Sequence, residues 1–356
     1  MKRRQFLDNA LAASATIAIP EILRARETSS SQRLGITMAS YMQRWRNRQD
    51  ESSGVPGWKD ALDVLDHCKE LLAGCLQIGV ARWTEDFAGE VRDRRESYGI
   101  ALEGQIRLPW ETQDTERFEK DLRAAKEAGA TVLRTVCLGG RRYETFETLD
   151  SWKEFVGRSY AALERAEPLA AKHGLKLGVE NHKDWRTEEH LALLGHLDSE
   201  HVGVTFDFGN NIALLEDPVE QAEALAPWII STHTKDMALA SHPEGFYLSE
   251  VPLGSGVLDL PRLMEICRSH HPEVWFNLEM ITRDPLEVPV LTDRYWETID
   301  DSLPAHHLVK NLSMARDRNV DQLPHISPLE LSDQLALEEK HIRMSFQHAQ
   351  TSLGLV

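Results

Sequence analysis

The chain has 356 residues, 42% of them hydrophobic, which suits one large α/β domain with extensions or two small domains. Its formal net charge of −17 argues against binding to phosphate backbones, so nucleic acid is not an expected partner. Residues 1–31 hold five Lys/Arg and three Asp/Glu, so the remaining chain is more acidic still, at −19. The four cysteines lack C-x-x-C spacing and stand in apolar segments, which argues against a disulfide framework or a cysteine zinc site.

The N-terminus carries a basic pair followed by an apolar segment. Arg3 and Arg4 open the sequence RRQFL, which resembles the core of a bacterial twin-arginine export signal. The apolar segment is too short and too polar to span a membrane. We therefore expect residues 1–31 to be a signal and linker that direct the chain to the periplasm or another extracytoplasmic place. An ordinary amphipathic start, which would leave the chain in the cytoplasm, is the alternative.

Short apolar runs then alternate with amphipathic segments. Strands are predicted at 34–40, 76–81, 99–108, 131–139, 176–181, 202–208, 228–234 and 274–280. Helices with 3.6-residue apolar spacing are predicted at 58–73, 115–129, 151–172, 187–197, 217–226 and 259–269. This alternation predicts a parallel sheet, and eight strands with crossover helices favour a closed (β/α)₈ TIM barrel over residues 32–285. A doubly wound open sheet is the alternative, weakened because no G-x-G-x-x-G follows the first strand.

The alternation stops near residue 284. Residues 286–356 look helical and polar and show no catalytic pattern. We expect them to be a C-terminal helical extension that wraps the barrel or forms the subunit contact of a homo-oligomer.

Ligand-type residues follow four apolar runs in the second half of the chain. They are Glu180, Asp207, His233 and Glu279. Because the C-terminal ends of parallel strands meet at one edge of a sheet, we expect their side chains to converge. Three carboxylates and an imidazole would make an open site for one divalent metal ion. Mn²⁺, Mg²⁺ and Co²⁺ suit such ligands, with Zn²⁺ as a further option.

The segments around these residues resemble the sugar phosphate isomerase/epimerase family, whose fold is a xylose-isomerase-like barrel. The matching pieces are E-N-H at 180–182, D-x-G-N at 207–210, H-x-K-D at 233–236, L-G-S-G-x-L-D-L-P-R-L at 253–263 and L-E at 278–279. The resemblance covers about residues 34–285. It implies that the four ligand-type residues bind one divalent cation. It also implies that Glu180 and Glu279 act as an acid/base pair.

The activity implied by the resemblance is that of a metal-dependent sugar isomerase or epimerase. In such an enzyme a carboxylate removes the proton next to the substrate carbonyl, and the cation stabilises the metal-bound enediolate. Glu180 and Glu279 come from different strands and would address opposite faces of that intermediate. A lyase or dehydratase acting on keto-sugars or 3-keto-glycosides would use the same enediolate, and it is the close alternative.

Two alternatives belong to other classes. A non-catalytic sugar- or metal-binding barrel would hold the ion without exchanging substrate protons. Phosphodiester hydrolysis, as in the apurinic-site endonucleases that share this barrel, would need further metal ligands and a basic groove, which the acidic charge opposes. The expected partner is therefore a small-molecule sugar or sugar derivative.

Several neighbours of the four ligands are candidates for substrate binding. They are His182, Asn210, Lys235, Asp236 and Arg141. His182 lies on the same side of its strand as Glu180, and Lys235 could supply positive charge to an oxyanion.

Two positions differ from those of ketose 3-epimerases, and an arginine pair has two possible roles. Asn210 and Arg186 stand where ketose 3-epimerases carry a substrate-binding His and a Glu. Arg141, with Arg142, follows the fourth predicted strand and either meets an anionic group at the barrel mouth or is a solvated loop charge.

Overall fold

The computed structural model describes residues 33–50, 54–299, 303–317 and 320–355. Eight parallel strands close into a barrel in the order β1-β10-β7-β6-β5-β4-β3-β2. They are β1 (Leu34–Thr37), β2 (Cys75–Gly79), β3 (Ala101–Gln105), β4 (Val132–Thr135), β5 (Lys176–Glu180), β6 (Val202–Asp207), β7 (Ile229–Thr234) and β10 (Phe276–Leu278). The predicted TIM barrel is thereby confirmed. The predicted export signal, residues 1–31, lies outside the described residues.

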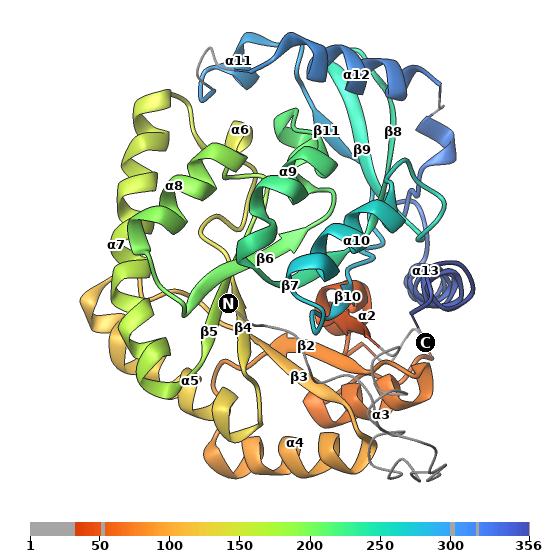
Figure 1. The fold of residues 1–356 in the computed structure, drawn as a ribbon. Helices are drawn as coiled ribbons and strands as arrows, with labels where there is room; N and C mark the ends of the chain where they lie inside the picture. Colours follow the sequence, from red (N-terminus) through yellow and green to blue (C-terminus); the bar gives the residue numbers. More distant parts are fainter. Residues whose placement is uncertain (1–32, 51–53, 300–302, 318–319, 356) are drawn as a thin grey trace, which may run out of the picture.

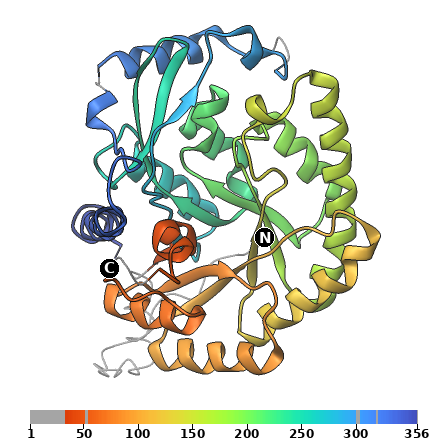
Figure 2. The same cartoon turned by 180° about the vertical axis from the view of Figure 1, so that it is seen from behind.

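Most of the helices surround the barrel on its outer side, whereas α11 (Asp293–Trp296) and α12 (Ala305–Arg316) lie at one end of the molecule (Figures 1 and 2). The other helices are α2 (Met42–Arg46), α3 (Ala61–Leu71), α4 (Glu85–Tyr98), α5 (Thr115–Glu127), α6 (Arg142–Thr145), α7 (Leu149–His173), α8 (Thr187–Leu197), α9 (Pro218–Leu225), α10 (Leu260–His270) and α13 (Leu331–Ser352). Within the described ranges, none of these helices is long and apolar enough to cross a membrane.

Helix α4 is absent from the sequence prediction, although its ends carry clear signals. Thr84 accepts a hydrogen bond from the Phe87 backbone N–H at the start, and Gly99 ends the helix in the left-handed conformation. Only Ala88 and Val91 are buried, so the helix has almost no apolar stripe. An apolar period of 3.6 residues therefore could not be read from it.

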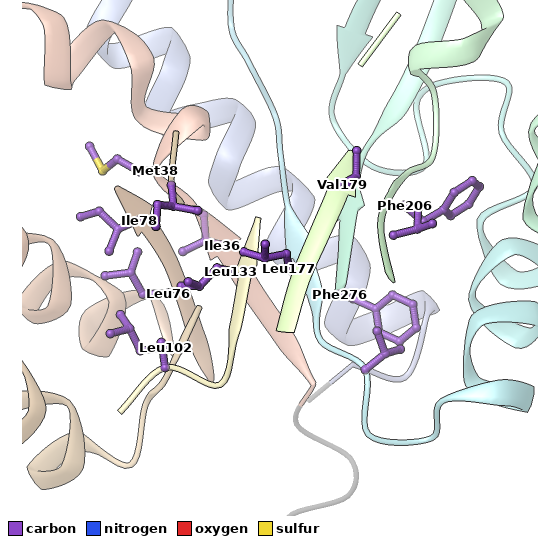
Figure 3. Packing of buried hydrophobic residues seen from close by; sticks show 14 of the residues in the cluster. Ile36, Met38, Leu76, Ile78, Leu102, Leu133, Leu177, Val179, Phe206 and Phe276 are labelled. Carbon is purple, nitrogen blue, oxygen red and sulfur yellow. The ribbon is translucent and has the colours of Figure 1, made fainter. Parts of the chain in front are cut away.

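The core fills the barrel and the layer between strands and helices. Figure 3 shows apolar side chains of several strands gathered in one cluster, among them Ile36, Leu76, Leu133 and Leu177. These side chains are almost completely buried. The four cysteines are also buried and free, as expected for small core residues.

A second, three-stranded sheet was not expected from the sequence. Strands β8 (Asp236–His242) and β9 (Gly245–Val251) form an antiparallel hairpin between β7 and α10, and β11 (Leu286–Val288) pairs with β9. In Figure 1 this sheet and α12 lie together at one end of the barrel. The expected helical extension thus begins with a strand, because Leu286 and Val288 are buried while Glu287 between them is exposed.

Helix α13 packs into the barrel wall near β1. Ile342 and Phe346 are buried in the main core, and the helix lies against α2. Glu338 accepts hydrogen bonds from the backbone N–H groups of Gln43 at 2.6 Å and Arg44 at 3.0 Å. The far C-terminal helix therefore helps to close the layer that covers the first strand.

Candidate metal centre

The four ligand-type residues come together at the C-terminal ends of neighbouring barrel strands. Glu180 ends β5, Asp207 ends β6, and Glu279 follows β10 directly. His233 lies one residue before the end of β7. One donor atom of each residue lies within 4.8 Å of the others, and all four residues are buried. The expected convergence is present, and the buried cluster is consistent with a metal site.

The spacing of the donor atoms suits a small divalent cation. His233 Nδ1 lies 3.2 Å from Glu180 Oε1 and 3.2 Å from Glu279 Oε1. Asp207 Oδ2 is 3.8 Å from the same nitrogen. Bonds of roughly 2.1 Å at right angles place neighbouring ligand atoms about 3 Å apart.

A hydrogen bond on the far side of the His233 ring determines which ring nitrogen carries the proton and which keeps its lone pair. Gln77 donates its amide Nε2 to Glu103 Oε2 at 3.0 Å, so its Oε1 is turned to His233. His233 Nε2 then donates to Gln77 Oε1 at 2.7 Å. Nδ1 keeps its lone pair and is buried without an aligned hydrogen-bond partner. A cation shared with the three carboxylates would satisfy that lone pair, so the residues present fit a metal ion.

Two basic side chains hold the outer oxygens of the glutamates. Arg134, in β4, donates from Nε to Glu180 Oε2 at 2.5 Å, and its Nη2 contacts the same oxygen. Lys235 Nζ lies 2.5 Å from Glu279 Oε2 and 2.7 Å from Asp207 Oδ2. Each glutamate thus directs one oxygen to a cationic side chain and the other to His233.

The same neighbours shift the protonation of the cluster. Burial alone would raise the pKa of Glu180 and Glu279, but Arg134, Lys235 and His233 outweigh it and lower both pKa values. For Asp207 burial dominates and raises the pKa to about 6. Burial would lower the pKa of His233, but Glu279 and Glu180 reverse the sign and raise it. A field that favours a proton on the imidazole also favours a metal cation in its place.

Asn210 contacts the ligands themselves. Its Nδ2 donates to Glu180 Oε1 at 3.1 Å, and its backbone N–H donates to Asp207 Oδ1 at 2.8 Å. Its own Oδ1 accepts from the buried Lys183. These contacts orient two ligand carboxylates, and a direct role in substrate binding stays a prediction.

Asp236 is occupied by backbone groups. Its carboxylate accepts N–H hydrogen bonds from Met237 at 2.9 Å, Gly254 at 3.0 Å, Gly256 at 2.8 Å and Leu258 at 3.2 Å. A Cβ at Gly256 would lie 2.1 Å from Asp236 Oδ1, which explains why this loop needs glycine there. The geometry therefore supports a role in folding the 253–258 loop, and a substrate contact stays a prediction.

His182 and Arg141 lie in the loops that follow β5 and β4. His182 Nδ1 donates to the Leu138 carbonyl at 2.9 Å, and burial lowers the pKa of its ring to about 4. The ring is therefore neutral at pH 7, with Nε2 as a hydrogen-bond acceptor. Arg141 pairs with Glu144 at 2.5 Å and is only partly exposed.

Arg142 and Arg186 are structural residues in this fold. Arg142 is buried over the Trp152 ring at 4.0 Å and pairs with Glu189 at 2.7 Å. Arg186 is buried as well, with Nε 3.9 Å from Glu216 Oε1. Neither guanidinium is placed to meet a substrate anion at the barrel mouth.

Sequence reasoning missed several residues of the site. Gln77, Glu103 and Arg134 are polar side chains inside predicted apolar strands, and that contrast was the available signal. Glu250 had no such signal, because the hairpin that carries it was not predicted. It is buried in β9, with Oε1 3.9 Å from Lys235 Nζ and 2.5 Å from Arg283 Nη2. The additional sheet therefore contributes to the electrostatics of the centre.

A cleft of about 660 Å³ opens at the C-terminal ends of β1, β2 and β3. Gln105, the last residue of β3, lines it and donates to Gln77 Oε1 at 3.0 Å. Because that oxygen also accepts from His233, the cleft wall is two hydrogen bonds away from the candidate ligands. The cleft has the size of an ordinary small-molecule site.

A further group of ligand-type side chains lies at the surface. It comprises Glu220, His306 and His307, of which only His307 is buried. The Glu180 group is the better candidate for a resident metal, because all four of its members are buried and held by neighbours.

Comparison with known proteins agrees with this geometry. Residues 70–298 match the model of a family described as the xylose isomerase-like TIM barrel. The 3-oxo-isoapionate decarboxylase of Pectobacterium atrosepticum is 25% identical over 243 residues, which cover 68% of this chain and 83% of the relative. The 3-dehydroshikimate dehydratase of Bacillus anthracis is 26% identical over 164 residues, covering 41% and 57%.

Solved structures show the same fold at lower identity. D-psicose 3-epimerase from Clostridium cellulolyticum H10 superposes with a TM-score of 0.55 at 12% identity, covering 80% of this chain and 96% of that one. Since the family model spans more than half of the sequence and the barrel carries the buried ligand cluster, the chain belongs to the xylose isomerase-like TIM barrel family.

Proposed function

We propose that the protein is a divalent-metal-dependent enzyme that removes a proton next to the carbonyl of a keto-sugar, with isomerisation or epimerisation as the outcome. The proposal is carried by the buried convergence of Glu180, Asp207, His233 and Glu279 at the C-terminal face of the barrel. Enzymes of the sugar isomerase/epimerase-like superfamily use this fold, and a sugar is the substrate that the family suggests.

The two glutamates are proposed as the proton-transferring groups. A bound divalent cation would supply Lewis acidity to the substrate's carbonyl and adjacent hydroxyl oxygens. Glu180 ends β5 and Glu279 follows β10, and β6 and β7 lie between these two strands, so the glutamates approach the substrate from different sides. Their lowered pKa values keep both ionised at neutral pH. One carboxylate removes the proton and the other returns it to the opposite face.

Arg134 and Lys235 keep these carboxylates in place for that task. Each holds the outer oxygen of one glutamate and leaves the inner oxygen directed at the centre. Gln77 and Glu103 fix the His233 tautomer from behind. All of these groups are buried or nearly so, which limits the access of water to the reacting carbon.

A lyase is the second candidate. Two relatives are named as a decarboxylase and a dehydratase, so bond-breaking next to a carbanion occurs among similar proteins. This chain also carries Asn210 and Arg186 at the positions where ketose 3-epimerases bind substrate, and both side chains make internal contacts. A dehydratase would use the same proton abstraction and expel water, whereas a decarboxylase would break a C–C bond, release carbon dioxide and then protonate the carbon.

A single assay separates these activities. The protein is loaded with Mn²⁺, Mg²⁺, Co²⁺ or Zn²⁺ and incubated in deuterated water with a panel of keto-sugars and 3-keto-glycosides, followed by NMR. Isomerisation or epimerisation incorporates deuterium and yields an isomer, whereas a lyase releases a fragment, carbon dioxide or water. Metal binding without exchange on any substrate would favour the non-catalytic binding barrel.

We also propose that residues 1–31 direct export through a twin-arginine pathway. The supporting observation is the RRQFL sequence. Replacing Arg3 and Arg4 by lysine preserves charge but removes the guanidinium geometry. Cell fractionation should then find the double variant retained in the cytoplasm, and unchanged export would contradict this proposal.

A further inference from the structure

The charges that line the cleft differ from those of the whole chain. The protein has a net charge of −17. The cleft is nevertheless lined by three basic side chains, Arg46, Lys59 and Arg82, and by one acidic side chain, Asp60. A positively charged entrance on an otherwise acidic protein attracts negatively charged ligands.

The three basic side chains are not used by the fold. All three are exposed, and none has an ion-pair partner within the described ranges. Asp60 is already committed, because its carboxylate accepts the Leu62 backbone N–H at 2.8 Å as the N-cap of α3. The described cleft therefore has three basic side chains without an ion-pair partner against the single carboxylate of Asp60, an excess of positive charge.

Arg82 adds an independent sign of functional constraint. Its backbone has φ = 67°, a left-handed conformation that bulky residues rarely adopt. The position lies three residues after the end of β2, in the loop that lines the cleft. Such conformations cost free energy and are concentrated at binding and catalytic sites. An asparagine or glycine would meet the backbone requirement more easily, so the arginine side chain itself is the feature to explain.

Aromatic side chains form part of the remaining wall of the cleft. Trp45, Trp83 and Phe87 line it, and the rings of the last two meet edge to face with centroids 5.4 Å apart. Aromatic faces pack well against the C–H face of a sugar ring, while the basic groups require an anion on the same molecule. The occupant should thus combine a ring or carbon chain with a negative charge.

We propose that Arg46, Lys59 and Arg82 bind an anionic group on the substrate, at the end remote from the reacting carbonyl. The substrate class is then an acidic keto-sugar, with a carboxylate or a phosphate. This inference rests on the proposed function, since it assigns the cleft to the substrate of the Glu180 centre. Gln105 links the two regions, because it lines the cleft and hydrogen-bonds to the Gln77 that holds His233.

Three ketoses that differ only at C6 test the proposal. They are D-fructose, D-fructuronate and D-fructose 6-phosphate. Binding to the metal-loaded, full-length protein is measured by isothermal titration calorimetry, and solvent exchange at the carbon next to the carbonyl by NMR in deuterated water. We expect at least one anionic ketose to bind about tenfold or more tightly than D-fructose, which corresponds to one charge-assisted contact. The preference should shrink as ionic strength rises.

Substitution of the three basic residues then tests whether they cause the preference for anionic ketoses. The triple variant Arg46→Gln, Lys59→Gln, Arg82→Gln should bind all three ketoses with the affinity that the wild type has for D-fructose. Arg123→Gln is the matched control, since Arg123 is an exposed arginine of α5 outside the cleft. It should keep the full preference. The tighter of the two anions identifies whether the natural group is a carboxylate or a phosphate.

The outcomes separate this inference from the proposed function. Equal binding of the three ketoses, no binding of either anion, or a preference that survives in the triple variant overturns the anion site. Exchange on D-fructose in the same experiment would leave the proposed function standing. Conversely, an anion preference that depends on the three residues supports the site even where no proton exchange is seen, and the proposed proton transfer would then fail for these ketoses.

Discussion

The barrel mouth has two unlike sides. On the side of β5, β6, β7 and β10, polar side chains are buried and held by defined partners, as in the contacts of Glu180 with Arg134 and Asn210. On the side of β1, β2 and β3, an open cleft carries basic groups that have no partner in the described structure. Buried groups that are held by hydrogen bonds tolerate little change, whereas exposed ones can vary freely. The first side is therefore suited to a shared chemistry, and the second to the choice of substrate.

The largest effect is expected from removing a ligand on the buried side. Asp207→Ala or His233→Ala should abolish the binding of the divalent ion, because three remaining donors make an incomplete and less specific site. Elemental analysis of purified protein gives the metal content. His201→Asn, at the opposite end of β6, is the control and should retain the ion. Full occupancy in both ligand variants would show that the cluster is not the metal centre.

The next effect concerns the two glutamates. Glu180→Gln and Glu279→Gln should each eliminate turnover with only partial loss of metal, because the amide retains a ligating oxygen but cannot accept the substrate proton. One variant is expected to exchange the substrate proton with solvent without forming product, and the other to do neither. NMR in deuterated water distinguishes them. Turnover like that of the wild type, after metal is restored, would leave these residues as ligands only.

A smaller effect on metal affinity is expected from replacing Gln77, which accepts a hydrogen bond from the His233 ring. Gln77→Met keeps the volume but removes the acceptor for His233 Nε2–H, so the tautomer with Nδ1 free is no longer favoured. Metal affinity should fall by about 10–100-fold, the usual consequence of losing such a partner. Competition with a chelator measures it. Gln334→Met in α13, far from the centre, should have no effect. Unchanged affinity in Gln77→Met would remove the proposed link between the cleft and the centre.

The smallest effect is a pH dependence of metal binding. Burial raises the pKa of Asp207 to about 6, and the neighbouring glutamates raise the pKa of His233. Both groups must lose a proton to bind the cation, so affinity should decrease as pH falls through about 6 and be nearly constant above the higher of the two pKa values. Calorimetric titration between roughly pH 5 and 8 tests this sign. Tighter binding at acid pH would contradict the ligand assignment.

The sequence by itself determined the barrel and the position of the four candidate ligands. Each ligand directly follows an apolar run, and parallel strands of similar length bring their C-terminal ends to one face, so convergence follows from local pattern and fold class. The same reasoning missed α4, whose polar surface has little apolar periodicity, and the β8–β9–β11 sheet, whose β8–β9 hairpin is inserted between β7 and α10. A helix or strand can be recognised from the sequence only when its buried apolar residues recur at a regular spacing.

Only the tertiary structure decided how those ligands are held. His233 and Gln77 are 156 residues apart, and Glu180 and Arg134 are 46 apart, yet both pairs are in hydrogen-bond contact. The cleft likewise joins residues from the loops after β1, β2 and β3 that have no common sequence pattern. Such contacts depend on the register and closure of the barrel, and side-chain direction across a closed sheet is set by all eight strands together. For that reason the ligand types could be read from the chain, whereas their protonation, their partners and the charge of the neighbouring cleft could not.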